Sequence, residues 1–165
     1  QAAANVPCEM PILKSAFIFS ALTGLRWSDI EKLVWSEVQH SEQSGYYIRF
    51  RQKKTKGAET LPISEQAFTL LGERKKQDDK VFDGLYYSAW HNLKLREWVM
   101  KAGITKHITF HCARHTYATL QITLGTDIYT VSKLLGHRHL KTTEIYAKVI
   151  DHKKQEAANK IKIDL

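Results

Sequence analysis

Residues 111–116, His-Cys-Ala-Arg-His-Thr, hold three side chains that could carry out chemistry on a phosphate group. The planar guanidinium of Arg114 can donate two parallel hydrogen bonds and keeps its charge, which suits a phosphate whose negative charge spreads during reaction. If a helix starts after Thr109, its dipole favours the neutral imidazole of His111, the form that accepts a proton. His115 is expected to pack inward as a hydrogen-bonded structural residue. The segment therefore predicts a phosphate clamp combined with an acid–base group.

A metal site is a second interpretation of these histidines. His107, His111 and His115 recur every four residues, with Cys112 beside them. A zinc metalloprotease helix would read His-Glu-x-x-His, but Cys112 stands where the glutamate base belongs. A structural zinc site usually has paired cysteines at short spacing, and Cys8 is far away in the sequence. The pattern therefore disfavours a metal site.

A non-catalytic interpretation concerns residues 127–149. They predict a helix, a short turn with glycine and another helix, an arrangement that could dock in a DNA groove. Residues 111–116 would then be ordinary core packing. This alternative stays open, although it leaves Arg26, Lys54 and Tyr146 without a role.

The composition describes a small basic protein. Its 165 residues are 43% hydrophobic and 25% charged, which fits one compact domain with a real core. The net charge of +8 suggests a polyanionic partner, most simply nucleic acid, although a merely basic protein is the alternative. The two cysteines are too few for a disulfide framework and fit a reducing cytoplasm. No apolar run approaches the roughly 20 residues of a membrane span.

The first third of the chain predicts a tight corner between two helices. The pattern of residues 11–22 predicts a helix, and Gly24 supplies its stop because glycine readily takes the left-handed conformation. A short second helix is expected from Ser28, since Ser28 and Glu31 have capping-box spacing. Arg26 would then lie on the constrained backbone between the two helices.

The remaining patterns predict a small sheet followed by helices. Residues 46–51 and 60–63 alternate like two antiparallel strands, with Lys54 in the turn between them, and Ser64 can cap the next helix. Further helices are expected over residues 86–101, 111–124, 127–135 and about 141–149. The core candidates of the first of these are Trp90, Leu93 and Trp98. The result is an α+β domain that is mainly helical.

Several short motifs occur in order along nearly the whole chain. They are Ala-Leu-Thr-Gly-Leu-Arg-Trp-Ser-Asp at 21–29, Lys-Lys-Thr-Lys-Gly at 53–57, the segment 111–116, and Leu-Leu-Gly-His at 134–137 with a tyrosine nine residues later. Each motif alone is weak evidence, but the ordered set resembles the catalytic domain of tyrosine recombinases, the phage integrase family. The resemblance implies six catalytic residues: Arg26, Lys54, His111, Arg114, His137 and Tyr146.

The resemblance implies that Tyr146 is a nucleophile toward DNA. Its hydroxyl would attack a phosphodiester, form a 3′-phosphotyrosine and release a 5′-hydroxyl. A phenol with a pKa near 10 needs help in losing its proton at neutral pH, and His111 is the candidate base. Lys54 would protonate the leaving 5′-oxygen, with Lys53 and Lys56 as rivals for that role.

The other three residues would stabilise charge. Arg26 and Arg114 would bind the oxygens of the pentacoordinate transition state, and His137 would hydrogen-bond a phosphate oxygen. Because side chains supply every positive charge, the resemblance implies no metal and no cofactor. The covalent ester conserves the bond energy for rejoining.

The resemblance also implies an organisation. The fold would be the tyrosine-recombinase catalytic fold, with a three-stranded antiparallel sheet in the N-terminal half. Residues 1–165 would be the C-terminal part of a longer protein, separated from its N-terminal core-binding domain, as the start at Gln1 suggests. Residues 151–165 would form a tail that docks on a neighbouring subunit. The partners would be double-stranded DNA and, in the full-length protein, three further copies in a tetramer, in a bacterial cytoplasm at the nucleoid and with no membrane.

Two related functions stay open at this point. A non-cleaving DNA-binding regulator could use the same scaffold. A type IB topoisomerase would share the chemistry but relax supercoiled DNA without exchanging strands.

Overall fold

The computed structural model describes residues 2–51, 58–137 and 139–146 of the chain. They belong to two compact units, residues 1–115 and residues 116–165, each of which is treated by itself. Within the described ranges, no helix combines the length and the apolar character that crossing a membrane requires.

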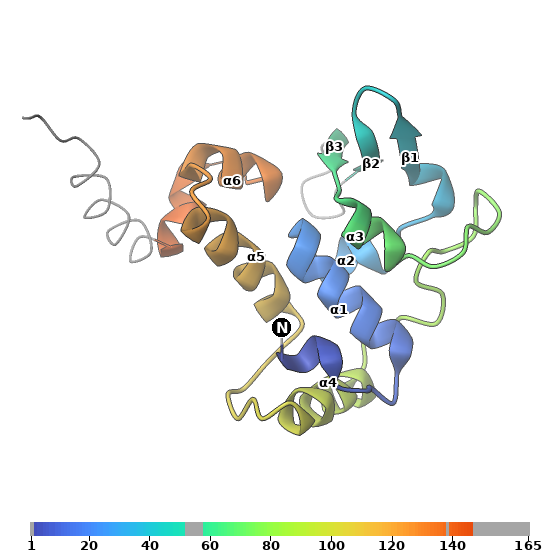
Figure 1. Cartoon of the computed structure of the whole chain (residues 1–165), viewed down its shortest axis with the longest axis vertical. Coiled ribbons are helices and arrows are strands. Elements are labelled where there is room, and N and C mark those ends of the chain that lie inside the picture. The colour runs from blue at the N-terminus through green and yellow to red at the C-terminus, as the bar shows by residue number, and fades with distance from the viewer. Residues whose placement is uncertain (1, 52–57, 138, 147–165) are drawn as a thin grey trace, which may run out of the picture. The chain divides into compact units, whose positions relative to one another are not determined.

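The first unit mixes helices with one small sheet, as the sequence predicts (Figure 1). Its elements in chain order are η1 (Ala2–Asn5), α1 (Pro11–Thr23), α2 (Trp27–Ile30), η2 (Trp35–Glu37), β1 (Val38–Ser41), β2 (Gly45–Arg51), β3 (Ala58–Pro62), α3 (Glu65–Thr69) and α4 (Ala89–Lys101). Helix α5 (His111–Thr123) begins in this unit and continues into the second.

The sheet has the order β1-β2-β3, and both of its strand pairs are antiparallel. Ile48 in the central strand faces Val38 on one side and Leu61 on the other. These three side chains are at most 5% exposed, so they form the core-facing side of the sheet. The two strands predicted from alternation are confirmed, and β1 supplies the third strand that the family resemblance implies.

Helix α1 ends where the sequence predicts. Gly24 takes a left-handed conformation with φ of 71°, and its N–H donates to the carbonyl of Ser20 at 2.8 Å. The buried face of the helix carries Leu13, Ala16, Phe19, Ser20 and Thr23. A side chain at position 24 would disfavour this left-handed conformation, so glycine fixes the start of the corner.

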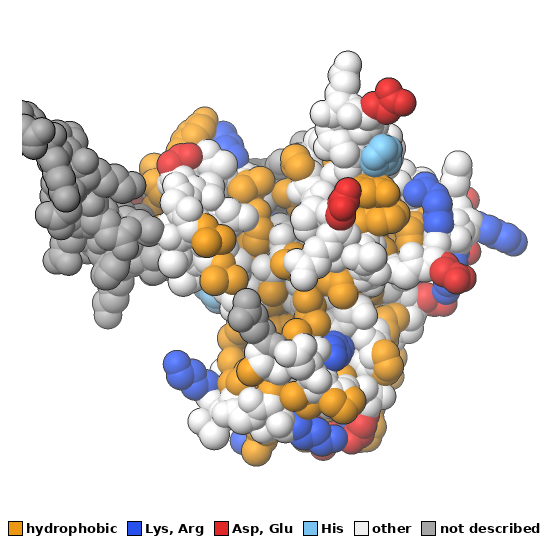
Figure 2. All heavy atoms as spheres, in the orientation of Figure 1, with side chains coloured by type: hydrophobic (Ala, Val, Ile, Leu, Met, Phe, Trp, Pro, Cys, Tyr) orange, Lys and Arg blue, Asp and Glu red, His pale blue; other side chains and the backbone are white. Residues whose placement is uncertain are grey.

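The core-facing side of α4 differs from the prediction. Trp98 is buried, but Trp90 and Leu93 are 53% and 47% exposed, so two of the three core candidates are wrong. The buried side chains are His91, Leu95, Trp98 and Val99. A prediction from hydrophobicity selects the wrong face of α4, because the polar residue His91 lies on the face that packs against the core. Figure 2 shows the hydrophobic side chains that remain on the surface around α4, at the lower end of the view.

The segment before α1 is attached to α1 and α4 by polar contacts. The carbonyl of Val6 accepts hydrogen bonds from Lys14 Nζ at 2.9 Å and from Trp98 Nε1 at 3.0 Å. Glu9 pairs with Lys94 at 2.8 Å and with Lys101 at 3.1 Å. Hydrogen bonds and charge from these two lysines lower the pKa of Glu9. The segment is therefore an ordered part of the first unit.

The second unit contains the rest of α5, helix α6 (Ile128–Leu134) and η3 (Leu140–Tyr146). Asp127 caps α6, because its Oδ1 accepts the N–H of Thr130 at 2.9 Å. The helix predicted over 127–135 is confirmed. The helix predicted from 141 is a 3₁₀ helix up to Tyr146, and residues 147–149 lie outside the described part. A hydrophobic cluster holds the unit together: Tyr117, Ala118, Ile122, Val131, Leu135 and Tyr146.

Candidate active site

Arg26 occupies the corner between α1 and α2. Helix α2 begins at Trp27, and Arg26 is its N-cap residue, with an extended backbone whose carbonyl accepts the N–H of Ile30 at 3.0 Å. The prediction that Ser28 caps this helix is wrong, because Ser28 already lies inside the first turn. The Arg26 side chain does not cap the helix.

Side chains of α1 fix the backbone just before Arg26. Ser20 Oγ donates to the carbonyl of Leu25 at 2.8 Å, and Thr23 Oγ1 accepts the N–H of Leu25 at 3.4 Å. Thr23 Oγ1 also donates to the carbonyl of Phe19 at 2.7 Å. All of these groups are buried. The position from which the Arg26 side chain departs is therefore held by the helix before it.

Arg114 is directed to the same corner. Its side chain is 5% exposed, and Nη1 donates to the carbonyl of Gly24, two residues before Arg26. Burying an arginine is costly unless its charge and donors are matched, so this contact constrains the guanidinium strongly. The structure thus brings two of the predicted residues, Arg26 and Arg114, to one corner of the first unit.

A buried carboxylate accompanies the two arginines. Asp29, which lies in the first turn of α2, is 2% exposed, and its Oδ1 is 4.0 Å from Lys32 Nζ. The start of a helix favours negative charge, because the free N–H groups point toward it. The corner between α1 and α2 therefore contains an acidic group, Asp29, as well as basic groups.

His111 begins α5, as predicted. The N–H of Cys112 donates to the carbonyl of Thr109 at 3.0 Å, which forms the turn that starts the helix. His111 is exposed, and its ring contacts the half-buried ring of His115 edge-on at 4.5 Å. Cys112 Sγ accepts the N–H of Thr109 at 3.4 Å, so this thiol takes part in the helix start. His111 lies one turn before Arg114 on the same helix.

The lysine of the predicted site belongs to the segment between β2 and β3. Strand β2 ends at Arg51 and β3 begins at Ala58. Lys54 and its rivals Lys53 and Lys56 lie outside the described residues.

His137 and Tyr146 belong to the second unit. The Nδ1 atom of His137 lies 2.8 Å from Oγ1 of Thr143, which is fully buried. The N–H of His137 donates to the carbonyl of Ser132 at 2.9 Å, so backbone and ring are both held. Tyr146 is 7% exposed and packs in the hydrophobic cluster. Thr143 was not predicted from the sequence, since no motif distinguishes it from its neighbour Thr142.

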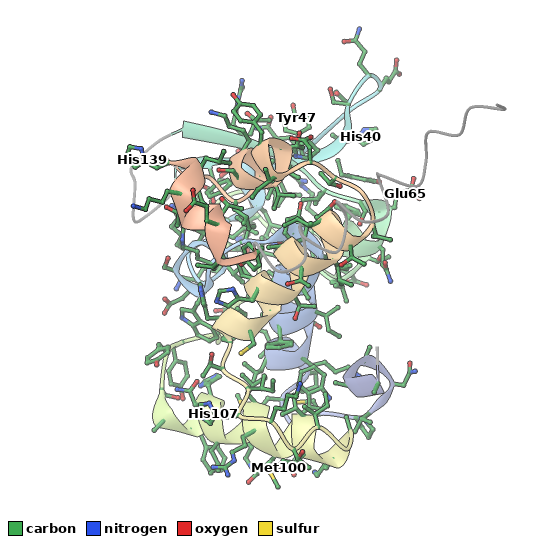
Figure 3. The ribbon with its side chains drawn as sticks, turned by 90° about the vertical axis from the view of Figure 1, so that its left-hand side faces the viewer. His40, Tyr47, Glu65, Met100, His107 and His139 are labelled. Carbon is green, nitrogen blue, oxygen red and sulfur yellow. The ribbon has the colours of Figure 1, made fainter. Side chains whose placement is uncertain are left out.

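A pocket of about 460 Å³ lies beside His111 in the first unit. Figure 3 labels His107, one of its lining residues, on the segment between α4 and α5. The lining combines aromatic with polar side chains: Trp27, Tyr87, Asn92, Arg96, His107, Ile108, Thr109, Phe110 and His111. This pocket was not predicted from the sequence, because its walls come from three separate segments.

The sequence matches known proteins over most of its length. Residues 2–153 match the model of the phage integrase family. The XerA tyrosine recombinase of Saccharolobus solfataricus is 31% identical over 131 residues, which are 78% of this chain and 43% of that protein. The integrase of Haemophilus phage HP1 is 32% identical over 125 residues, 76% of this chain and 34% of the integrase. The chain thus spans less than half the length of these relatives.

Solved structures share the fold. The catalytic domain of bacteriophage HP1 integrase matches with a TM-score of 0.66 and 26% identity, covering 96% of this chain and 87% of that domain. XerH recombinase bound to its palindromic difH substrate matches with a TM-score of 0.70 and 18% identity, covering 96% of this chain and 49% of XerH. These matches confirm the mainly helical α+β class with its three-stranded antiparallel sheet. The chain therefore belongs to the phage integrase family.

Proposed function

We propose that this chain is the catalytic domain of a site-specific tyrosine recombinase, which cuts and rejoins DNA strands through a 3′-phosphotyrosine intermediate. The observation that supports this most is the hydrogen bond from Arg114 to Gly24, because it brings a buried guanidinium to the corner that carries Arg26. Two arginines at one corner, one of them held by a buried hydrogen bond, suit a phosphodiester whose charge grows during reaction. Membership of the phage integrase family supports the same function.

In the proposed cleavage step, the hydroxyl oxygen of Tyr146 attacks the phosphorus and the bond from phosphorus to the 5′-oxygen breaks. His111 takes the phenolic proton, and Lys54 gives a proton to the leaving 5′-oxygen. His111 fits the role because it is exposed and lies in the first turn of α5, where a neutral imidazole is favoured. Rejoining is the reverse reaction with the 5′-hydroxyl of a second strand.

The charge on the phosphate would be stabilised by Arg26, Arg114 and His137. A positioned guanidinium is effective here because it needs no reorganisation when the transition state forms. The bond between His137 Nδ1 and Thr143 orients the imidazole, and in the proposed role Nε2 donates to a phosphate oxygen. With these residues and Lys54, the mechanism requires no metal and no cofactor.

The proposal extends to the partners of the full-length protein. Related proteins have been captured on DNA: XerH on difH, and a dimer of lambda integrase on a core site. We propose double-stranded DNA as the substrate, bound by a tetramer in the bacterial cytoplasm at the nucleoid. Residues 151–165 would dock on a neighbouring subunit.

A nicked suicide substrate tests the proposed chemistry. The full-length protein is incubated with duplexes from its native flanking DNA that carry a nick beside the candidate scissile phosphate, so that the short 5′-hydroxyl strand diffuses away. A covalent protein–DNA band on a denaturing gel is expected. The band should disappear in Tyr146→Phe and persist in Tyr129→Phe, a matched change at an exposed tyrosine of the same unit.

Other outcomes would select another function. DNA binding without any adduct would indicate a non-cleaving regulator. Relaxation of supercoiled DNA without strand exchange would indicate topoisomerase activity. An adduct that survives Tyr146→Phe would refute the assignment of the nucleophile.

A further inference from the structure

We propose that the pocket beside His111 binds a single unstacked nucleotide of DNA, with its base held by the aromatic side chains and its phosphate by the basic rim. The proposal deepens the proposed function and rests on it for the source of the nucleotide. The pocket lies entirely within the first unit, and His111 belongs both to its lining and to the proposed active site.

Three aromatic rings form one side of the pocket. Trp27 is approached edge-on by Phe110, with ring centroids 4.6 Å apart, and by Tyr87, at 5.9 Å. Phe110 is 5% exposed, whereas Tyr87 is 71% exposed. Aromatic side chains are the usual platform for unstacked bases, because every base has a π-face. The exposed Tyr87 ring can therefore stack on a base above a fixed floor of Phe110 and Trp27.

The polar rim offers donors for a base edge and for a phosphate. Asn92 and Arg96 are four residues apart on α4, so they project from one face of that helix. His107 comes from the segment that leads into α5, and His111 is the first residue of that helix. An asparagine amide matches the donor and acceptor pair of a base edge, and an arginine matches a phosphate.

The charge and the size of the pocket narrow the ligand class. Among the described residues, its lining contains the permanently charged Arg96 and no carboxylate, so an anionic ligand is favoured over a cation. The volume of about 460 Å³ lies in the range of pockets that enclose a small molecule. A flat, aromatic, anionic ligand of this size is a nucleotide.

The position of the pocket suggests what the nucleotide does. His111 borders the pocket and is the proposed base for the attack on the scissile phosphate, so a captured nucleotide would neighbour that phosphate. Removing one nucleotide from the base stack costs free energy, and a pocket that receives it compensates for this cost. The protein would then bind more tightly to DNA in which the base pair at this position is already weak.

A nuclear magnetic resonance titration tests the pocket without knowledge of the target sequence. The 165-residue chain is titrated with deoxyadenosine 5′-monophosphate while the indole N–H signal of Trp27 is followed. A saturable shift is expected, and deoxyribose 5-phosphate, which has no base, should leave the signal in place. Tyr87→Ala should raise the dissociation constant about tenfold, because it removes one stacking partner. Trp90→Ala, which changes an exposed aromatic residue of α4 outside the lining, is the matched control.

A binding experiment then extends the test to DNA. Two duplexes from the native flanking DNA are compared, one with an unpaired base beside the scissile phosphate and one with an abasic site there. The duplex with the unpaired base should bind more tightly, and Tyr87→Ala should remove the difference.

Three results would overturn the proposal. The first is an equal shift of the Trp27 signal with the nucleotide and with deoxyribose 5-phosphate. The second is a Trp27 signal that responds only to N-acetyltyrosinamide, which is titrated separately as a mimic of a protein side chain. The third is a preference for the duplex with the unpaired base that survives Tyr87→Ala. Any of them obtained while Tyr146 still forms covalent adducts refutes the nucleotide pocket alone. If the unsubstituted protein forms no covalent adduct with DNA, the proposed function is refuted. The titration with free nucleotide still tests whether the pocket binds a nucleotide.

Discussion

The guanidinium of Arg114 donates a hydrogen bond to the backbone carbonyl of Gly24, which lies 90 residues earlier in the chain. Gly24 ends α1 in a left-handed conformation, and Arg26 follows as the N-cap residue of α2. One long-range contact therefore joins the start of α5 to the corner of the first two helices. The same contact contributes to the stability of the first unit and sets the position of the arginine.

Arg114→Lys should lower both the rate of adduct formation and the stability of the first unit. Lysine keeps the positive charge but lacks the planar fork, so it cannot hold the Gly24 carbonyl and face a phosphate together. We expect the rate of adduct formation on the nicked substrate to fall about 100-fold or more. The free energy of unfolding in urea should fall by about 1–3 kcal/mol, because a buried carbonyl loses its partner. Arg49→Lys, a change on the exposed side of β2, is the control. An unchanged adduct rate would contradict the role of Arg114.

Substitutions of Tyr146 should separate packing from chemistry. The residue is 7% exposed in the cluster of the second unit, so the ring contributes to packing whatever its hydroxyl does. Tyr146→Phe should abolish adducts and lower the free energy of unfolding by no more than about 1.5 kcal/mol. Tyr146→Ala should lower it by about 3–5 kcal/mol, because it leaves a cavity. Equal stability of the two variants in urea unfolding would show that the cluster does not depend on this ring.

Thr143 should act as a positioning residue for His137. Thr143→Val removes the hydroxyl that lies 2.8 Å from Nδ1 of His137, and we expect adduct formation to slow about tenfold. Thr143→Ser keeps the hydroxyl and should restore most of the rate, which a purely structural role of the methyl group would not predict. Thr142→Val, at an exposed neighbour, is the matched control. Quench-flow or gel assays of adduct formation provide the measurement.

The buried His91 should make the stability depend on pH. Burial lowers the pKa of His91, so below about pH 6.5 the unfolded chain binds a proton that the folded chain resists. The free energy of unfolding should therefore decrease as the pH falls from 6.5 toward 5. His91→Phe should make this decrease shallower, because the ring then has no proton to bind, while His40→Gln at an exposed position of β1 should not. Urea unfolding at a series of pH values measures this dependence. If the free energy of unfolding changes with pH equally in His91→Phe and in the unsubstituted protein, a role for His91 is excluded.

Local signals in the sequence predicted most of the elements. Gly24 ends α1, Ser64 caps α3 by accepting the N–H of Ala67 at 3.2 Å, and the alternating residues of β2 form a strand. Each of these features depends on interactions within a few residues, which is why the sequence reveals them. The cap at Ser28 failed because Arg26 already has the extended backbone of an N-cap residue, so the helix starts earlier than the side-chain pattern suggests.

Features that depend on distant segments could not be predicted in this way. The face of α4 was misjudged because the burial of His91 depends on its packing against Tyr86 and Trp27, which hydrophobicity does not reveal. The motifs identified Arg26 and Arg114 as candidates. The hydrogen bond from Arg114 to Gly24, which brings Arg114 to the corner that carries Arg26, depends on segments 90 residues apart.

The carbonyl of Val6 has a practical consequence for shortened versions of this protein. Both of its acceptor positions are occupied, one by the ammonium of Lys14 and one by the indole N–H of Trp98. A truncation that removes Val6 would leave the indole N–H of Trp98 without its acceptor. The lost hydrogen bond would destabilise α4, the helix that borders the pocket beside His111. Expression fragments should therefore begin before Val6, and affinity tags placed ahead of it need a spacer that leaves this peptide group undisturbed.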